Sequence, residues 1–331
     1  MKKVWTTIAF IAGALLLLLL ASALSLRGIR DAGNDHRDFY ALERDSIDVL
    51  FVGSSLAYCG FVPAVLEEEY GISSYVCGSP NQSMLADYLW AEEAWKTQHY
   101  RVLVVEAMSF PMSHGDVAND LRSLNTMKRF STYPKLALTY KRESYKVLFP
   151  VFEFHDAWET MHLKNAFAPV REEAAFLRGY VPVLSRAESA EQILDETSAD
   201  SAYLKFDYID RIADFCEEKG ITLMVVKTLQ ARADVNHWDM GYHNRVAEYC
   251  AGRDIPFYDF NTAALAQAAG LDPAADVAGD GRHTNFDGAK KTTEYLGQIL
   301  TEMSETDFRG KTADTAWTGE FDAFLAKMRQ E

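Results

Sequence analysis

The sequence predicts an α/β fold, a flavodoxin-like doubly wound sheet of five parallel strands that alternate with helices. Three observations predict it. Short, almost continuous apolar runs recur along the chain, as expected for strands buried on both faces of a parallel sheet. Stretches with helical spacing of apolar residues separate these runs. Turn motifs follow the first runs, at the edge where open α/β sheets place their ligands.

The front half of the chain supplies three of the five strands. Residues 46–110 read as strand, helix, strand, helix, strand. The first strand is the apolar run 48–52, the second helix includes residues 87–96, and the third strand is 101–105. The remaining two strands are expected in the back half.

In the back half an amphipathic helix over residues 206–219 ends at Gly220, a residue suited to a left-handed helix stop. The strands are predicted at 221–226 and 255–260, with a helix over 243–251 between them. Another helical stretch, with apolar residues on one face, covers 289–300.

Residues 111–200 break the alternation of strands and helices. They are rich in aromatic and charged residues, so we expect a mostly helical insertion within a domain that spans 46–305. An insertion that follows the third strand would hang over the carboxyl edge of the sheet, as a lid or a polymer-binding element. The tail, 306–331, is expected to form a last helix.

The amino terminus indicates a membrane location. Lys2 and Lys3 precede an uncharged run over residues 4–26, within an amino-terminal segment of residues 1–30. That run is long enough to cross a hydrocarbon core of ~30 Å. It predicts a single-pass anchor with the body outside the cytoplasm and 31–45 as a polar linker. The alternative is a cleaved signal peptide and a secreted protein, because residues 21–23 have the small-x-small form of a cleavage site.

The amino-acid composition restricts the classes of molecule that the protein could bind. The chain has 331 residues, 48% of them hydrophobic, which suffices for a large core, and a net charge of −15. Nucleic acid is disfavoured, because its phosphates require a basic face. No spacing of His or Cys suggests a metal site, and nothing indicates a cofactor. Cys59 and Cys77 could approach each other after export, although burial of all four cysteines as free thiols is the simpler expectation.

Two motifs more than two hundred residues apart supply the parts of a serine nucleophile site. Gly53-Ser54-Ser55-Leu56 follows the first strand, and Asp280-Gly281-Arg282-His283 precedes the helical stretch at 289–300. A serine hydroxyl is a weak nucleophile until an imidazole takes its proton, and a third group must fix the tautomer of that imidazole. Ser55, His283 and Asp280 are therefore the predicted catalytic residues.

These motifs resemble those of the SGNH/GDSL hydrolase superfamily. Gly53-Ser54-Ser55-Leu56 is similar to its G-D-S-L block with Ser54 in place of Asp, and Asp280 with His283 matches its D-x-x-H block. More narrowly, the chain resembles membrane-anchored cell-envelope proteins of the DltD and AlgX type, which serve O-acylation of surface polymers. That resemblance rests on residues 51–55, 78–83, 153–158 and 283–289.

The chain departs from the superfamily pattern after the third strand. The family places an Asn for the oxyanion hole there, whereas this chain continues with Glu106, which we interpret as structural. The oxyanion donors must then come from elsewhere. The backbone N–H groups of Ser55 and Gly78 and the side chains of Asn81 or Gln82 are the candidates, although residues 78–81 could also be a plain turn.

Four further residues are substrate-binding candidates. His155 and Trp158 match the envelope subfamily and could contact an acceptor sugar, or His155 could be a buried structural residue. His237 and Trp238 follow the fourth strand and could line the cleft, or lie on a surface loop.

The sequence thus predicts a membrane-tethered SGNH-type serine acyltransferase or esterase. It would act on O-acyl groups of a cell-envelope polysaccharide or a teichoic-acid-like polymer, with an acylated carbohydrate or polymer as substrate and a membrane O-acyltransferase as a candidate partner. A secreted carbohydrate O-acetyl esterase and a non-catalytic polymer- or partner-binding protein of the same fold are the alternatives.

Overall fold

A computed structural model of the chain describes residues 2–30, 33–112, 114–127, 129–155, 166–187, 204–230, 237–303, 308 and 315–330. The helices that surround the sheet are α2 (Ser55–Gly60), α3 (Pro63–Tyr70), α4 (Met84–Gln98), α10 (Asp207–Lys219), α11 (His237–Gly252), α12 (Ala263–Ala268), α13 (Pro273–Asp276) and α14 (Phe286–Glu302). Two 3-10 turns, η1 (Asp38–Ala41) and η2 (Ala107–Ser109), precede β1 and follow β3.

The centre of the molecule is a parallel sheet of five strands, as the sequence predicts. The strands are β1 (Val49–Gly53), β2 (Ser74–Gly78), β3 (Val102–Glu106), β4 (Thr222–Lys227) and β5 (Phe257–Asp259). Their order is β2-β1-β3-β4-β5, so the chain reverses direction across the sheet between β1 and β3. Every residue of β1, β2 and β3 is buried, which explains why these strands read as continuous apolar runs.

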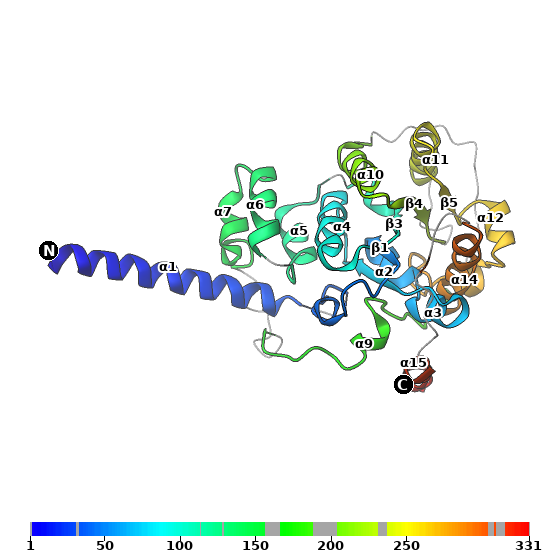
Figure 1. Cartoon of the computed structure of the whole chain (residues 1–331), viewed down its shortest axis with the longest axis horizontal. Coiled ribbons are helices and arrows are strands. Elements are labelled where there is room, and N and C mark those ends of the chain that lie inside the picture. The colour runs from blue at the N-terminus through cyan, green and yellow to red at the C-terminus, as the bar shows by residue number, and fades with distance from the viewer. Residues whose placement is uncertain are drawn as a thin grey trace.

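Helices cover both faces of the sheet, which makes it doubly wound (Figure 1). On one face Leu50 and Val52 of β1 pack into a core with α4, α10 and α11. On the other face Val49 and Phe51 pack with α2, α3 and α14. Because consecutive side chains of a strand point to opposite faces, each strand supplies both cores.

The insertion is mostly helical over its described part. It contains α5 (Val117–Ser123), α6 (Arg129–Thr139), α7 (Ser144–Leu148), η3 (Pro150–Phe152) and α9 (Ala174–Leu177). The first four elements lie on the side of the body next to α4 and the amino-terminal helix (Figure 1). The final helix of the chain, α15 (Thr315–Met328), buries Phe321 and Leu325 against α3 and α9.

The amino-terminal helix α1 (Lys2–Gly28) projects from the body (Figure 1). Its 27 residues have a mean hydropathy of 2.5 over the most apolar window, of which only 6% is buried, so the helix is long and apolar enough to cross a membrane. A signal sequence would meet the same criterion. Its last turns differ from the rest, because Ser22, Ser25 and Leu26 are buried against the body.

The segment after α1 is not a free spacer, contrary to the polar linker expected at residues 31–45. Phe39 is 1% exposed and belongs to the core on the α4 face of the sheet. His36 is also buried, and its imidazole Nε2 lies 2.8 Å from the carbonyl oxygen of Gly78, where it donates a hydrogen bond in the neutral ring. Aromatic packing against Tyr75 and Trp90 therefore ties this segment to β2 and α4.

Candidate active site

The turn after β1 presents Ser55 rather than Ser54. Gly53 has a φ of 151°, and a Cβ at this position would lie 2.7 Å from the Cβ of Glu106, so only glycine fits. Ser54 is 2% exposed, and its hydroxyl oxygen caps α2 by accepting a hydrogen bond from the backbone N–H of Leu56. Ser55, the first residue of α2, is only partly buried.

A short hairpin-like loop between α13 and α14 carries the histidine. An isolated antiparallel bridge joins Val277 to Thr284, and the backbone N–H of Ala278 donates to the carbonyl oxygen of His283 at 2.7 Å. Asn285 caps α14 by accepting from the N–H of Gly288 at 3.1 Å, while its amide donates to the carbonyl oxygens of Ala275 and Val277. Asn285 thus fixes both the loop and the start of α14.

The loop brings the three predicted catalytic residues together. His283 Nε2 lies 2.8 Å from the hydroxyl oxygen of Ser55, and His283 Nδ1 lies 2.5 Å from Oδ2 of Asp280. With its proton on Nδ1, the imidazole donates to Asp280 and leaves Nε2 free to accept the serine proton. The geometry is therefore that of a nucleophile, a base and an orienting carboxylate in series.

Asp280 is held in its ionised form. Partial burial would raise the pKa of its carboxyl group, but hydrogen bonds from the backbone N–H and the imidazole of His283 and from the N–H of Arg282 outweigh it, so the pKa lies below its usual value. Its side chain is 52% exposed, whereas that of His283 is 22% exposed. The side chains of Asp280 and His283 therefore lie at the surface of the molecule.

The later part of the insertion braces both motifs. The N–H of Val181 donates to the carbonyl oxygen of Tyr58 in α2, and the N–H of Phe286 donates to that of Val183. Farther along, the N–H of Ala187 donates to the carbonyl oxygen of Val277. Residues 181–187 therefore connect the helix that begins at Ser55 to the loop that carries His283. Of the insertion predicted to form a lid, only this later part, residues 181–187, lies next to Ser55 and His283 among the described residues. The helices α5, α6 and α7 lie beside α1 and α4.

Besides Ser55, the three candidate oxyanion donors Gly78, Asn81 and Gln82 differ in what surrounds them. The side-chain nitrogen of Gln82 is buried and donates to the carbonyl oxygen of Cys77 and to Asp87, which commits it to the protein interior. Gly78 packs closely, since a Cβ there would lie 3.2 Å from the carbonyl oxygens of Gly53 and Ser54. Asn81 is exposed in a left-handed conformation with a φ of 53°. Gly78 and Asn81 thus remain as candidates.

A buried ion pair lies at the end of β3, the point in the sequence after which the superfamily pattern has an Asn. Glu106 and Lys227 are both 0% exposed, and Lys227 Nζ lies 3.2 Å from Oε1 of Glu106. Glu106 also accepts from the N–H of Met108 at 2.9 Å, and Oε1 lies 3.4 Å from both the N–H and the hydroxyl of Thr228. The sequence analysis missed Lys227, although a lysine that ends an apolar strand was the available signal.

The substrate-binding candidates do not gather around Ser55. His155 is exposed next to η3, where its Nδ1 lies 3.0 Å from the carbonyl oxygen of Phe152. Trp158 falls outside the described residues. His237 and Trp238 begin α11, on the carboxyl side of β4, and their side chains are not among those described. The four cysteines are buried and free, so Cys59 and Cys77 do not form a disulfide.

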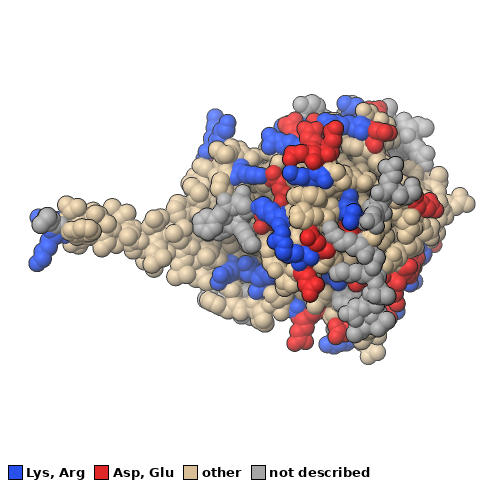
Figure 2. Space-filling view, viewed as in Figure 1, with Lys and Arg blue, Asp and Glu red and all other residues tan. Residues whose placement is uncertain are grey.

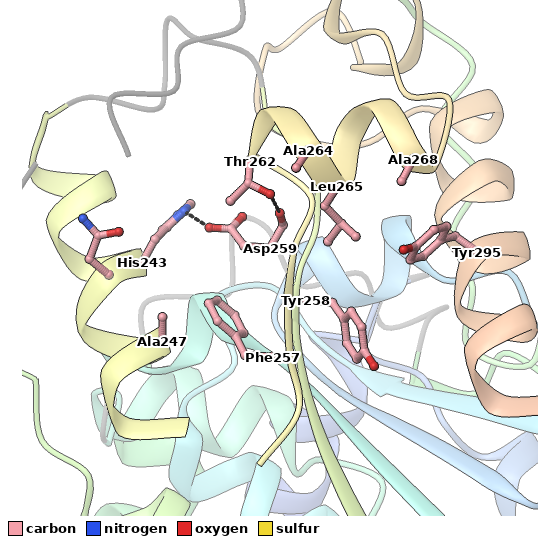
Figure 3. Close-up of a pocket in the computed structure, with 11 residues that line it drawn as sticks. His243, Ala247, Phe257, Tyr258, Asp259, Thr262, Ala264, Leu265, Ala268 and Tyr295 are labelled. Atoms are coloured by element: carbon pink, nitrogen blue, oxygen red, sulfur yellow. Dashed lines mark hydrogen bonds and ion pairs between the residues drawn. The ribbon is translucent and has the colours of Figure 1, made fainter. Parts of the chain in front are cut away.

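A second His–Asp pair lies away from Ser55, at the β5 edge of the sheet (Figure 3). His243 Nδ1 lies 2.8 Å from Oδ2 of Asp259, and both residues are buried. They line a cavity of about 560 Å³ between α11 and α12, together with Phe257, Tyr258 and Tyr295. None of the three predicted catalytic residues lines this cavity, and the described residues that line it include no serine or cysteine.

Several solved structures resemble this chain, among them two from Bacteroides species and one from Desulfitobacterium hafniense. A candidate acylhydrolase from Bacteroides fragilis is 12% identical, with 81% of this chain and 94% of that chain covered and a TM-score of 0.40. A GDSL-like lipase from Bacteroides thetaiotaomicron is 14% identical, with 80% and 94% covered and a TM-score of 0.39. A candidate lipolytic protein of the G-D-S-L family from Desulfitobacterium hafniense is 12% identical, with 76% and 98% covered and a TM-score of 0.37.

No family model and no curated protein matches the sequence.

Proposed function

We propose that the protein is an extracytoplasmic serine acyltransferase or esterase of SGNH type, which acts on O-acyl groups of a cell-envelope polymer. One observation carries the proposal: His283 lies between the hydroxyl of Ser55, at 2.8 Å, and the carboxylate of Asp280, at 2.5 Å. Because the two motifs are more than two hundred residues apart, this alignment requires the whole fold to assemble it.

The reaction would proceed through an acyl-enzyme. Ser55 Oγ attacks the carbonyl carbon of the donor ester while His283 Nε2 takes the serine proton, and Asp280 stabilises the imidazolium that forms. His283 then gives this proton to the departing alcohol oxygen, which leaves an acyl group on Ser55. A polymer hydroxyl or water next attacks that acyl group and passes its proton to His283, and the proton returns to Ser55 as the new ester or the free acid departs.

The negative oxygen formed at each attack requires hydrogen-bond donors. The backbone N–H of Ser55 is one, since it lies at the start of α2 where helical N–H groups are unpaired. Gly78 and Asn81, on the loop that follows β2, would supply others. The position of Asp280, half-exposed, beside His283, partly exposed, suits a polymer, whose long chain could not enter an enclosed pocket.

α1 would keep the enzyme at the membrane, as in the envelope O-acylation proteins that the sequence resembles. Cleavage after Ala23 would cut a stretch whose neighbours Ser22, Ser25 and Leu26 are buried against the body. This packing supports an anchor that stays attached. Amino-terminal sequencing of the membrane-extracted protein should find the residues before Ala21, and a mature start near Leu24 would show that a signal peptide is removed.

A fluorophosphonate probe tests the nucleophile with a matched control in the neighbouring residue. We expect the full-length protein and the Ser54→Ala variant to be labelled and the Ser55→Ala variant to be unlabelled. Ser54→Ala removes only the cap of a short helix, worth about 1 kcal/mol. Labelling that persists in Ser55→Ala would assign the nucleophile elsewhere, and an unlabelled wild-type protein would favour the non-catalytic binding function.

Hydrolysis of an activated acetyl ester with and without an acceptor polymer then separates the two activities. A transferase should raise the mass of the polymer by one acetyl group for each group lost from the ester. An esterase should release acetate alone. Either product should disappear in Ser55→Ala.

A further inference from the structure

Exposed apolar side chains gather on the insertion. Outside α1, the large hydrophobic residues that are exposed among the described residues are Leu138, Tyr145, Leu148, Phe152, Phe167 and Val170. Three of them, Tyr145, Leu148 and Phe152, lie in α7 and η3 and form what we call the α6–η3 patch. Their exposed fractions are 50%, 51% and 45%. Soluble surfaces seldom group aromatic and aliphatic residues in this way without a partner.

The α6–η3 patch adjoins the helix α1. η3 packs against α1, and the ring of Phe152 lies 5.9 Å from that of Tyr145 and 6.3 Å from that of Phe149. In Figure 1, α6 and α7 lie on the side of the body from which α1 projects. The patch therefore lies beside α1, on the side of the body from which α1 projects.

The length of the exposed part of α1 determines how far the α6–η3 patch would lie from the bilayer. Burial begins at Ala21 and Ser22, so residues 2–20 stand clear of the body apart from the half-buried Leu18. Nineteen residues of helix span about 28 Å, close to the ~30 Å of a hydrocarbon core. If these residues cross the bilayer, the end of the body next to α1 lies at the level of the headgroups.

Charge on this side of the molecule is opposite to that of the whole chain. Residues 129–152 contain five Lys or Arg and one Glu, whereas the chain has 33 basic and 48 acidic residues. Lys141 and Arg142, between α6 and α7, are exposed, and Arg27 is exposed near the end of α1. Figure 2 shows basic side chains and little acidic surface on the end of the body next to α1.

We propose that the α6–η3 patch rests on the bilayer, with Tyr145, Leu148 and Phe152 in the interfacial region and Lys141 and Arg142 on anionic lipid phosphates. The proposal rests on α1 as a retained anchor. Aromatic and aliphatic side chains flanked by cations are the composition that enters a headgroup boundary. A protein partner is less favoured, because the patch continues the apolar surface of α1 at the height where the bilayer ends.

Site-specific fluorescence in lipid nanodiscs tests this contact on the full-length chain. The four native cysteines are at most 3% exposed, so a single introduced cysteine can be labelled selectively in the folded protein. The patch position is Leu148→Cys, and the matched control is Gln267→Cys, exposed on α12 at the opposite end of the body. A third position, Ile11→Cys in the middle of α1, reports on the anchor itself.

We expect the label at position 148 to emit at shorter wavelength in phosphatidylglycerol discs than the label at 267, and to be quenched by lipids with a nitroxide near the headgroup. The nanodisc holds no other membrane protein, so this result can come only from lipid. A label at 148 that is as accessible to water-soluble quencher as the one at 267, while the label at 11 is quenched by deep nitroxides, would overturn the proposal. A label at position 11 that is not quenched would show that α1 does not cross the bilayer, which would also overturn the proposal.

Reversal of the two exposed charges tests the preference for anionic lipid. In the Lys141→Glu/Arg142→Glu variant, lipid contact at position 148 should fall by roughly fivefold or more for each charge, and it should weaken with added salt. The matched variant Lys219→Glu/Arg245→Glu, with both residues on other helices of the body, should leave this contact unchanged. Equal contact in phosphatidylcholine and phosphatidylglycerol would contradict the role given to Lys141 and Arg142. Ester hydrolysis by the same samples reports separately on the enzyme activity, so failure of the lipid contact is distinct from failure of the proposed function.

Discussion

At the scale of single residues, the unit formed by Ser55, His283 and Asp280 depends on hydrogen bonds in series. The hydroxyl of Ser55 lies within hydrogen-bond distance of the imidazole, and the imidazole is oriented by Asp280, whose other oxygen accepts from two backbone N–H groups. Loss of either of the first two members should therefore remove the function of the whole unit.

We predict strong non-additivity within this unit. Ser55→Ala and His283→Ala should each lower the rate of ester hydrolysis by about 10⁴-fold or more, and Asp280→Asn by less, because the carboxylate orients the base without touching substrate. The Ser55→Ala/His283→Ala variant should be no slower than either single variant. A double variant whose loss is the product of the two single losses would refute a shared mechanism.

The buried pair of Glu106 and Lys227 gives a second prediction at this scale. Removal of one partner leaves an uncompensated charge in the interior, so Glu106→Gln or Lys227→Met should lower the free energy of unfolding by about 3–5 kcal/mol. The Glu106→Gln/Lys227→Met variant should lose less than the sum of the two. Chemical unfolding measures all three, and strict additivity would show that the two side chains do not depend on each other.

At the scale of elements, the position of His283 depends on how α14 docks. The N–H of Val62, before α3, donates to the hydroxyl of Thr293, and the hydroxyl of Tyr70 donates to the carbonyl oxygen of Glu294. Gly297 allows the closest approach, because a Cβ there would lie 2.4 Å from ring carbons of Tyr70. A side chain at residue 297 would therefore require the ring of Tyr70 or α14 itself to shift.

We predict that Gly297→Ala separates α14 from α3 and moves the loop that carries His283. Overpacking of this kind costs about 1–3 kcal/mol, and a small shift of the base away from Ser55 should lower the rate of ester hydrolysis more than it lowers substrate affinity. Gly252→Ala is the matched control, since nothing lies within 4 Å of a Cβ at that position. Equal activity of the two variants would contradict the role of this contact.

At the scale of the whole molecule, His36 links stability to pH. Burial among Tyr75 and Trp90 lowers the pKa of its imidazole to about 4, because the charged form is poorly solvated there, and this outweighs the hydrogen bond to the carbonyl oxygen of Gly78, which raises the pKa. The folded protein thus favours the neutral ring more than the unfolded chain does. The contribution of His36 to stability is complete above pH 6.5 and is lost as the pH falls from about 6.5 towards about 4.

We predict that the wild-type protein loses about 2 kcal/mol of stability through His36 alone between pH 7 and pH 5. His36→Gln keeps a donor for Gly78 without a titratable ring, so it should be less stable at pH 7 but should show a smaller loss on acidification. Unfolding by denaturant at both pH values measures the difference. An unchanged pH dependence in His36→Gln would assign the acid sensitivity to other groups.

The sequence by itself determined the five parallel strands and the helices that alternate with them, because buried strands and amphipathic helices have periodicities that are local properties of the chain. It also singled out Ser55, His283 and Asp280, since the types and spacing of reactive residues are visible in the sequence. Only the tertiary structure decided that residues 33–45 pack into the body, that Lys227 meets Glu106, that the amide of Gln82 is committed to the interior, and that α14 docks so that His283 reaches Ser55. These features depend on contacts between residues far apart in the chain, whose distances and burial are set when the elements pack and leave no periodic trace in the sequence.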